Sequence, residues 1–244
     1  GCLFFPGDIL VIYAITGSIL YRFRNWEPLR LVRLGTILLV IQAIIVPILL
    51  LTPDDVPAEI RELEHLAFGE GSFGSAVLFR SISFAFTLPI FLIFQGISAL
   101  GWFCLGLAAV KSGMIDDADH PLWAKARKYC LVPGVCLSLA GAAVWQWVAP
   151  LAGASFTFFI APIATLGYLG SIAAIARPPG AFLARVLKAG GSSLSIYLGQ
   201  SIILSTVFAG YGLGLWEETD RLSAVLIALG SAIALIFAIS IWRI

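Results

Sequence analysis

Charged residues are scarce in this chain, at 12% of its 244 residues, whereas soluble domains carry about 25%. The formal net charge of +1 gives no indication of nucleic-acid binding. Histidine occurs only at His65 and His120, outside the long apolar segments, so those segments lack the commonest general base. The four cysteines form no C-x-x-C pair, which argues against a disulfide or metal role. These absences exclude most soluble and metal-centred classes of protein.

Apolar segments fill most of the chain, which is 60% hydrophobic with a mean hydropathy of +0.99. A transmembrane helix needs about 20 largely apolar residues, and in lipid a helix satisfies its own backbone polar groups. The sequence therefore predicts an all-α, polytopic transmembrane helical bundle that forms a single domain over residues 1–244. The predicted spans are residues 4–21, 31–51, 82–110, 129–149, 154–176, 191–211 and 222–242.

The basic residues are unevenly distributed between the two sides of this predicted bundle. Twelve of the 15 Lys and Arg residues fall on one side, and nine acidic residues fall on the other with only three basic ones. By the positive-inside rule, the N-terminus is then outside and the C-terminus cytoplasmic. An odd span count and a chain that starts at Gly1 predict a fragment that lacks both ends of a longer membrane protein.

Two loops are long. The external loop, 52–80, is predicted to contain a short amphipathic helix, 57–68, with Leu63, Leu66 and Ala67 turned inward. The cytoplasmic loop, 111–128, contains three carboxylates next to His120. Their spacing matches no metal-ligand pattern, and we interpret them as a solvated turn in which Asp119 caps the next helix and Pro121 begins it. No metal site is predicted.

Polar side chains follow one face of the third and the sixth predicted spans. The third is too long for a straight crossing, since residues 81–110 as one helix would be about 45 Å long. It must therefore tilt, extend or bend, with Pro89 as the bend point. The polar residues of the third segment are Arg80, Ser83, Thr87 and Ser98, with Gln95 close by; those of the sixth are Ser193, Tyr197, Gln200 and Ser201. Either both stripes line a shared polar cavity, or they make ordinary hydrogen bonds between helices.

Two charged residues lie near the external boundary of the predicted bundle. Asp8 begins the first span, and Arg80 precedes the third. A charge exposed to lipid is costly and a paired one is not. The two are therefore candidates for a salt bridge or for parts of one catalytic site. In the alternative reading, Asp8 caps the first turn of its own helix.

Several short motifs resemble one family of membrane proteins. Gly7-Asp8-Ile9-Leu10 with Tyr13-Ala14, then Gly71-Ser72-Phe73 with Arg80, are followed by Gly190, Leu194, Tyr197-Leu198, Gln200-Ser201 and Gly210-Tyr211-Gly212-Leu213-Gly214-Leu215. In this order they resemble the YeiB-like bacterial membrane proteins, grouped as domain-of-unknown-function family 418. The chain departs from the family pattern at Gly191-Ser192-Ser193 and at Ser195-Ile196, where an Asn of the family is missing.

The resemblance implies a function in the bacterial cytoplasmic (inner) membrane. The family has been grouped with membrane-embedded acyltransferases, which move an acyl group from cytoplasmic acyl-CoA to a small-molecule, lipid or glycan acceptor. On that reading Lys125, Arg127 and Lys128 would hold the CoA phosphates, although the orientation of the bundle alone also requires basic loops. No cofactor is evident. A transporter and a non-catalytic membrane component stay open, and Gly and Ala in the last four spans would allow oligomers.

Overall fold

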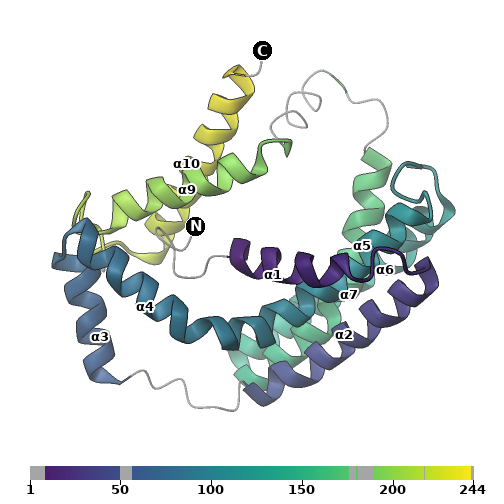
Figure 1. Ribbon diagram of the computed structural model, residues 1–244, viewed down its shortest axis with the longest axis horizontal. Helices are drawn as coiled ribbons and strands as arrows, with labels where there is room; N and C mark the ends of the chain where they lie inside the picture. Colours follow the sequence, from purple (N-terminus) through teal and green to yellow (C-terminus); the bar gives the residue numbers. More distant parts are fainter. Residues whose placement is uncertain (1–8, 50–56, 176–179, 181–189, 217, 243–244) are drawn as a thin grey trace. The chain divides into compact units, whose positions relative to one another are not determined.

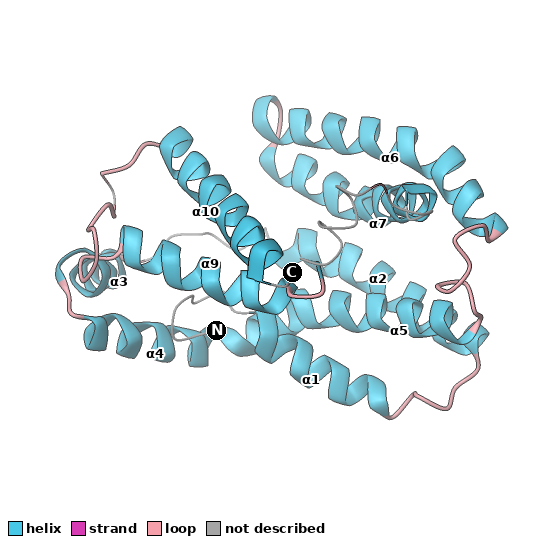
Figure 2. Ribbon diagram, turned by 90° about the horizontal axis from the view of Figure 1, so that it is seen from above, coloured by secondary structure: helices cyan, strands magenta, loops and turns pink. Residues whose placement is uncertain are grey.

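A computed structural model describes residues 9–49, 57–175, 180, 190–216 and 218–242. Within these residues every regular element is a helix, as Figure 2 shows, so the predicted all-α class is confirmed. The chain divides into two compact units. The terminal unit comprises Gly1–Leu10, Asp55–Pro89 and Pro179–Ile244, and the central unit comprises Val11–Asp54 and Ile90–Pro178. The prediction of one transmembrane domain stays a prediction.

The helices carry the labels of Figure 1. In the central unit they are α1 (Ile9–Tyr21, which this unit contains from Val11 on), α2 (Pro28–Leu49), the π-helical turn η2 (Leu92–Gly96), α5 (Ile97–Lys111), α6 (Pro121–Trp147) and α7 (Pro150–Ile175). In the terminal unit they are α3 (Ala58–His65), the π-helical turn η1 (Leu66–Glu70), α4 (Phe73–Phe91), α9 (Ser193–Phe208) and α10 (Arg221–Trp242).

Within the described ranges, five helices are long and apolar enough to cross a bilayer, by length and composition. They are Pro28–Ile48, Phe73–Lys111, Pro121–Trp147, Pro150–Ile175 and Arg221–Ile241. The helices found where the first and sixth spans were predicted are shorter, with 13 residues in α1 and 16 in α9. Repeated apolar helices of spanning length make this chain a membrane protein. The count of seven spans and the orientation of the termini stay predictions.

The long helix Phe73–Lys111 contains a local change in its hydrogen-bonding pattern. Pro89 lacks a backbone N–H and lies near the end of α4, and the π-helical turn η2 follows it at Leu92–Gly96. In the central unit, the buried Gln42 of α2 donates from Nε2 to the Phe94 carbonyl of this turn. A side chain thus bonds a carbonyl at the point where the helix departs from α-geometry. The boundary between the two units falls at Pro89.

Helices α6 and α7 form the most extensive helix pair in the central unit, and small residues set their distance. A Cβ added to Gly134 of α6 would lie 2.6 Å from Ala164 Cα, and one added to Gly167 of α7 would lie 2.5 Å from Leu131 Cα. Close backbone approach of this kind is typical of helix pairs in membranes. Glycines of the last four predicted spans were candidates for oligomer contacts. Two of them, Gly134 and Gly167, instead pack α6 against α7 within the chain.

In the terminal unit, α9 packs against α10. Gln200 of α9 donates from Nε2 to the carbonyl of Ala228, at 3.2 Å, and Gly199 leaves room for the side chain of Leu235. Asp220 caps α10 by accepting from the backbone N–H groups of Leu222 and Ser223. Hydrogen bonds from the side chain and backbone of Ser223 hold the pKa of the Asp220 carboxyl below its ordinary value.

Both long loops are shorter than predicted, because helices extend into them. Residues 73–80, placed in the external loop, begin α4, and α6 begins at Pro121 inside the expected cytoplasmic loop. The cap of α6 is His120, whose Nδ1 accepts from Leu122 N at 3.3 Å, so the prediction of Asp119 as the cap was wrong by one residue. Pro121 fixes this choice, because it occupies the first helical position.

The amphipathic helix of the external loop is present as α3, and helical geometry continues through η1 to Glu70. Ala67 is buried as expected. Leu63 and Leu66 are about half exposed, and their orientation toward the membrane stays a prediction. The π-helical turn widens the helix here, and it is Ala67 and Phe68 that become buried.

We expect Gly134→Ala to destabilise the protein. The added methyl would meet backbone atoms of α7, and overpacking of this kind costs about 1–3 kcal/mol. Gly106→Ala in α5 is the matched control, because no described atom lies within 4 Å of its added Cβ and Ala favours helix over Gly by about 1 kcal/mol. Thermal unfolding of both variants in detergent checks this expectation. Equal midpoints would contradict the close α6–α7 contact.

Candidate functional site

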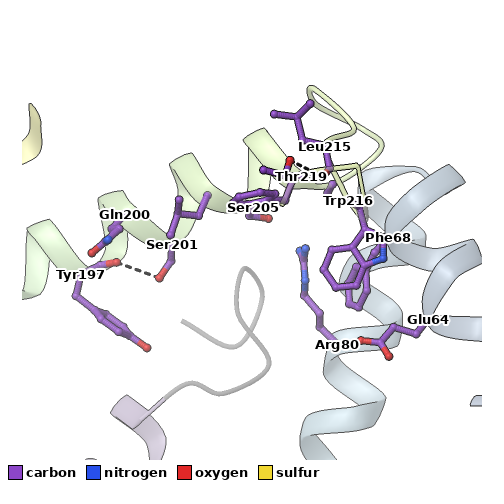
Figure 3. Close-up of a pocket in the computed structure, with 13 residues that line it drawn as sticks. Glu64, Phe68, Arg80, Tyr197, Gln200, Ser201, Ser205, Leu215, Trp216 and Thr219 are labelled. Carbon is purple, nitrogen blue, oxygen red and sulfur yellow. Dashed lines mark hydrogen bonds between the residues drawn. The ribbon is translucent and has the colours of Figure 1, made fainter. Parts of the chain in front are cut away.

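A cavity of about 580 Å³ lies within the terminal unit, and we call it the Arg80 cavity. Residues of α3, η1, α4 and α9, and of the segment that follows α9, line it. They are Glu64, Phe68, Arg80, Tyr197, Gln200, Ser201, Leu204, Ser205, Phe208, Ala209, Leu215, Trp216 and Thr219. Figure 3 shows Arg80, Phe68, Trp216 and Glu64 gathered toward one end, with Tyr197 toward the other. The volume is in the range of about 300–1,000 Å³ that suits small-molecule ligands.

Arg80 is the buried cation of this cavity, with 4% of its surface exposed. Its guanidinium carbon lies 4.8 Å from the centre of the Phe68 ring and 6.0 Å from that of Tyr211. An aromatic ring attracts a cation at such distances, most strongly where water is excluded. Phe68 in turn packs edge-on against Phe79 of α4, with ring centres 5.4 Å apart. The aromatic side chains therefore fix the position of the charge.

The segment after α9 is held by backbone contacts that only glycine permits. Gly210 N donates to the Phe68 carbonyl at 2.6 Å, and a Cβ at Gly210 would lie 1.9 Å from the Gly69 carbonyl oxygen. A Cβ at Gly212 would lie 1.8 Å from the Thr206 carbonyl oxygen. Gly214 has φ of +67°, which disfavours other residues. The three alternating glycines thus close the end of α9 and join it to η1.

Two aromatic side chains of this segment, Tyr211 and Trp216, lie near Arg80. The Tyr211 hydroxyl is hydrogen-bonded to that of Ser205, and its ring packs edge-on against Phe73 at 5.2 Å. The Trp216 ring centre lies 5.3 Å from that of Phe68. The Trp216 Nε1 atom is buried and has no acceptor in the part of the chain that the structure describes. A buried indole N–H without an acceptor is unusual, because its desolvation is uncompensated.

One face of α9 forms the wall of the cavity, from Tyr197 through Gln200, Ser201 and Leu204 to Phe208. Eleven residues separate its ends, or about 16 Å of helix. The Gln200 amide is bonded to α10, and the Ser201 hydroxyl donates to the Tyr197 carbonyl at 3.0 Å within its own helix. Both side chains therefore already have structural hydrogen bonds.

The polar residues predicted to form one stripe on the third segment lie in different environments. Arg80 lines the cavity together with Tyr197, Gln200 and Ser201 of the sixth-segment stripe. Ser83 and Thr87 line a separate, mainly apolar hollow of about 670 Å³ between α3, η1 and α4. The Thr87 hydroxyl donates to the Ser83 carbonyl at 2.8 Å, which is an intrahelical bond.

The remaining candidates lie elsewhere. Gln95 is exposed and Ser98 half-buried in the central unit, and Ser193 is exposed at the start of α9. Asp8 lies outside the described residues, so its pairing with Arg80 stays a prediction. Lys125, Arg127 and Lys128 are exposed on the first turns of α6 rather than in a loop, and their role toward acyl-CoA stays a prediction.

Sequence reasoning missed Phe68, Ser205, Tyr211 and Trp216 as parts of the site. Tyr211 lies within the motif Gly210-Tyr211-Gly212, but nothing in that motif indicates which side chain its ring contacts. Chemically, the cavity offers a buried cation, an indole donor and an apolar wall. Among the residues known to line it, Glu64 is the one carboxylate and none is His. No group of three metal-ligating side chains occurs in the described ranges. The arrangement favours binding an anion that carries an apolar group.

A model of the family described as protein of unknown function (DUF418) matches residues 109–243, more than half of the chain. The match contains α6, α7, α9 and α10, and it includes the α9 wall of the cavity but not Phe68 or Arg80. Neither a curated protein nor a solved structure matches the chain. The motifs from Gly190 to Leu215, which resemble this family in the sequence, lie within the matched region, and the chain belongs to the DUF418 family.

Proposed function

We propose that this membrane protein binds a molecule with an acyl chain in the Arg80 cavity. The observation that carries the proposal is the cavity itself, about 580 Å³ in volume and walled by Leu204, Phe208 and Leu215 beside polar side chains of α9. Apolar walls with a few placed polar groups are the usual character of a ligand site. A bilayer supplies acyl-chain molecules directly to such a site.

Acyl transfer is the reaction we propose for the bound molecule, and the family resemblance supports it. The acyl group would leave the thioester of acyl-CoA and join a hydroxyl or amine of an envelope acceptor, while the acceptor's proton passes to a base and CoA leaves as its thiol. Glu64 is the carboxylate of the described cavity lining, which makes it the candidate base. Exposed Lys125, Arg127 and Lys128 on α6 would hold the CoA phosphates.

The proposed setting is the bacterial inner membrane, with seven spans, the N-terminus outside and the C-terminus cytoplasmic. Distribution of the basic residues supports this orientation. Seven spans require α1 and α9 to cross as well, either with residues beyond their described ends or by local thinning of the bilayer.

We expect α9 to separate two sides of the membrane. Gly180 and Glu218 are both exposed and flank α9, so single cysteines at these positions in a cysteine-free chain report on it directly. In intact cells a membrane-impermeant maleimide should label Glu218→Cys, whereas Gly180→Cys and the cytoplasmic control Ser112→Cys should react only after permeabilisation. Labelling of positions 180 and 218 from the same side would refute the seven-span arrangement.

We expect Leu204→Trp to weaken acyl-chain binding strongly, because the larger side chain projects from the wall and narrows the cavity. Leu194→Trp is the matched control on the same helix, since Leu194 is 55% exposed and does not line the cavity. Saturable binding of radiolabelled monoolein or oleoyl lysophosphatidic acid to the purified chain should fall at least tenfold only in Leu204→Trp. Equal binding by both variants, or no saturable binding by the unaltered chain, would rule out this cavity.

Membranes that contain the protein should transfer radiolabel from acyl-CoA to envelope material, and Leu204→Trp should lose this transfer along with binding. Leu194→Trp should retain both activities, because it leaves the cavity unchanged. Binding without transfer would remove the acyl-transfer step and leave the binding function. Solute uptake without transfer would instead identify a transporter.

A further inference from the structure

We infer that the Arg80 cavity selects an amphiphile whose acyl chain carries an anionic oxygen group, a carboxylate or a phosphate, and that Arg80 and Trp216 hold that group. This inference rests on the proposed function, because it names the class of molecule that the same cavity binds. Two separate observations support it: the buried cation and the buried indole donor.

The first observation is the burial of Arg80. A cation with 4% exposure in a membrane protein is costly unless anionic or carbonyl oxygens surround it. The guanidinium carbon lies over the Phe68 ring, 4.8 Å from its centre. The five N–H donors lie in the guanidinium plane and remain directed toward its edge. That number of donors accommodates an anion in addition to a partner within the protein.

The second observation is the Trp216 indole. Its Nε1 is buried, lacks an acceptor in the described part of the chain, and belongs to a side chain that lines the same cavity. Trp216 and Arg80 both pack against Phe68, so their donors lie around one ring (Figure 3). An oxygen of a bound anion would accept from the indole and would also give the guanidinium a charged acceptor, in addition to its partner within the protein. A neutral headgroup would do only the first.

The rest of the cavity fits the acyl chain. The apolar residues Leu204, Phe208 and Leu215 belong to the same lining. The Glu64 carboxylate would repel a bound anion. However, Glu64 is half-buried, whereas Arg80 is almost fully buried. Water screens the more exposed charge better, so attraction by the guanidinium outweighs repulsion by the carboxylate. A volume of about 580 Å³ suits one chain rather than two.

Binding to the purified full chain in phosphatidylcholine nanodiscs tests the inference with three radiolabelled ligands that share one oleoyl chain. They are oleate, oleoyl lysophosphatidic acid and neutral monoolein. We expect at least one anionic ligand to bind about tenfold or more tightly than monoolein, since a hydrogen bond to a charged group carries about that much affinity. Preference for the phosphate ligand alone identifies a lipid phosphate, and preference for both identifies any chain-linked oxyanion.

Trp216→Phe is the decisive variant, because it keeps an aromatic ring at this position and removes the N–H donor; monoolein binding controls for the loss of the second ring. We expect it to reduce anionic binding about tenfold and to leave monoolein binding within about threefold. Arg80→Lys should also reduce the anionic preference, and Glu64→Gln should increase it. Circular dichroism and thermal unfolding of each variant confirm that the fold is retained.

The binding results distinguish failure of the proposed function from failure of this inference alone. If no ligand binds saturably, the proposed function itself is wrong. If all three bind equally, or if Trp216→Phe weakens monoolein and the anionic ligands alike, the cavity binds chains without selecting the anion and only this inference falls. Displacement of the labelled lysophosphatidic acid by equal concentrations of inorganic phosphate would show a free-anion site, which also overturns it.

Discussion

A peptide backbone in lipid has no water to bond with, and this constraint governs the chain. It explains why every regular element in the described residues is a helix and why the departures from α-geometry have specific partners. At η2 a buried glutamine side chain bonds a backbone carbonyl. At the end of α9 three carbonyls, those of Ser205, Thr206 and Val207, accept from N–H groups of the following segment. Backbone carbonyls at these interruptions of the helical pattern therefore have acceptor roles outside the regular α-helical ladder.

Because the hydrophobic effect does not draw helices together inside a bilayer, close packing has to do so. The α6–α7 pair shows this with Gly134 and Gly167, whose missing side chains allow backbone to approach backbone. The terminal unit uses a different means near Arg80, where aromatic rings surround a buried cation. Small residues thus set the α6–α7 distance, and aromatic rings surround the buried cation of the site.

The membrane class, the all-helical fold and the family were all predictable from the sequence, because long apolar runs and motif order are local signals. Helix ends were less predictable. The cap of α6 moved from Asp119 to His120, and α4 began eight residues before position 81, because capping geometry depends on details that composition does not record. Helical spacing identified Arg80, Tyr197, Gln200 and Ser201 as polar members of their faces, and they share a cavity. Phe68 and Trp216 could not be found this way, since their position depends on how η1 meets the segment after α9.

The alternating glycines of the segment 210–215 have a consequence for recognising other proteins of this kind. Each is required by the backbone: by the contact with Gly69, by the contact with Thr206, or by a positive φ. Selection acting on these positions would preserve a turn whatever the protein binds. A shared glycine pattern here is therefore evidence of common architecture, whereas the identity of the residue at position 216 would indicate common specificity.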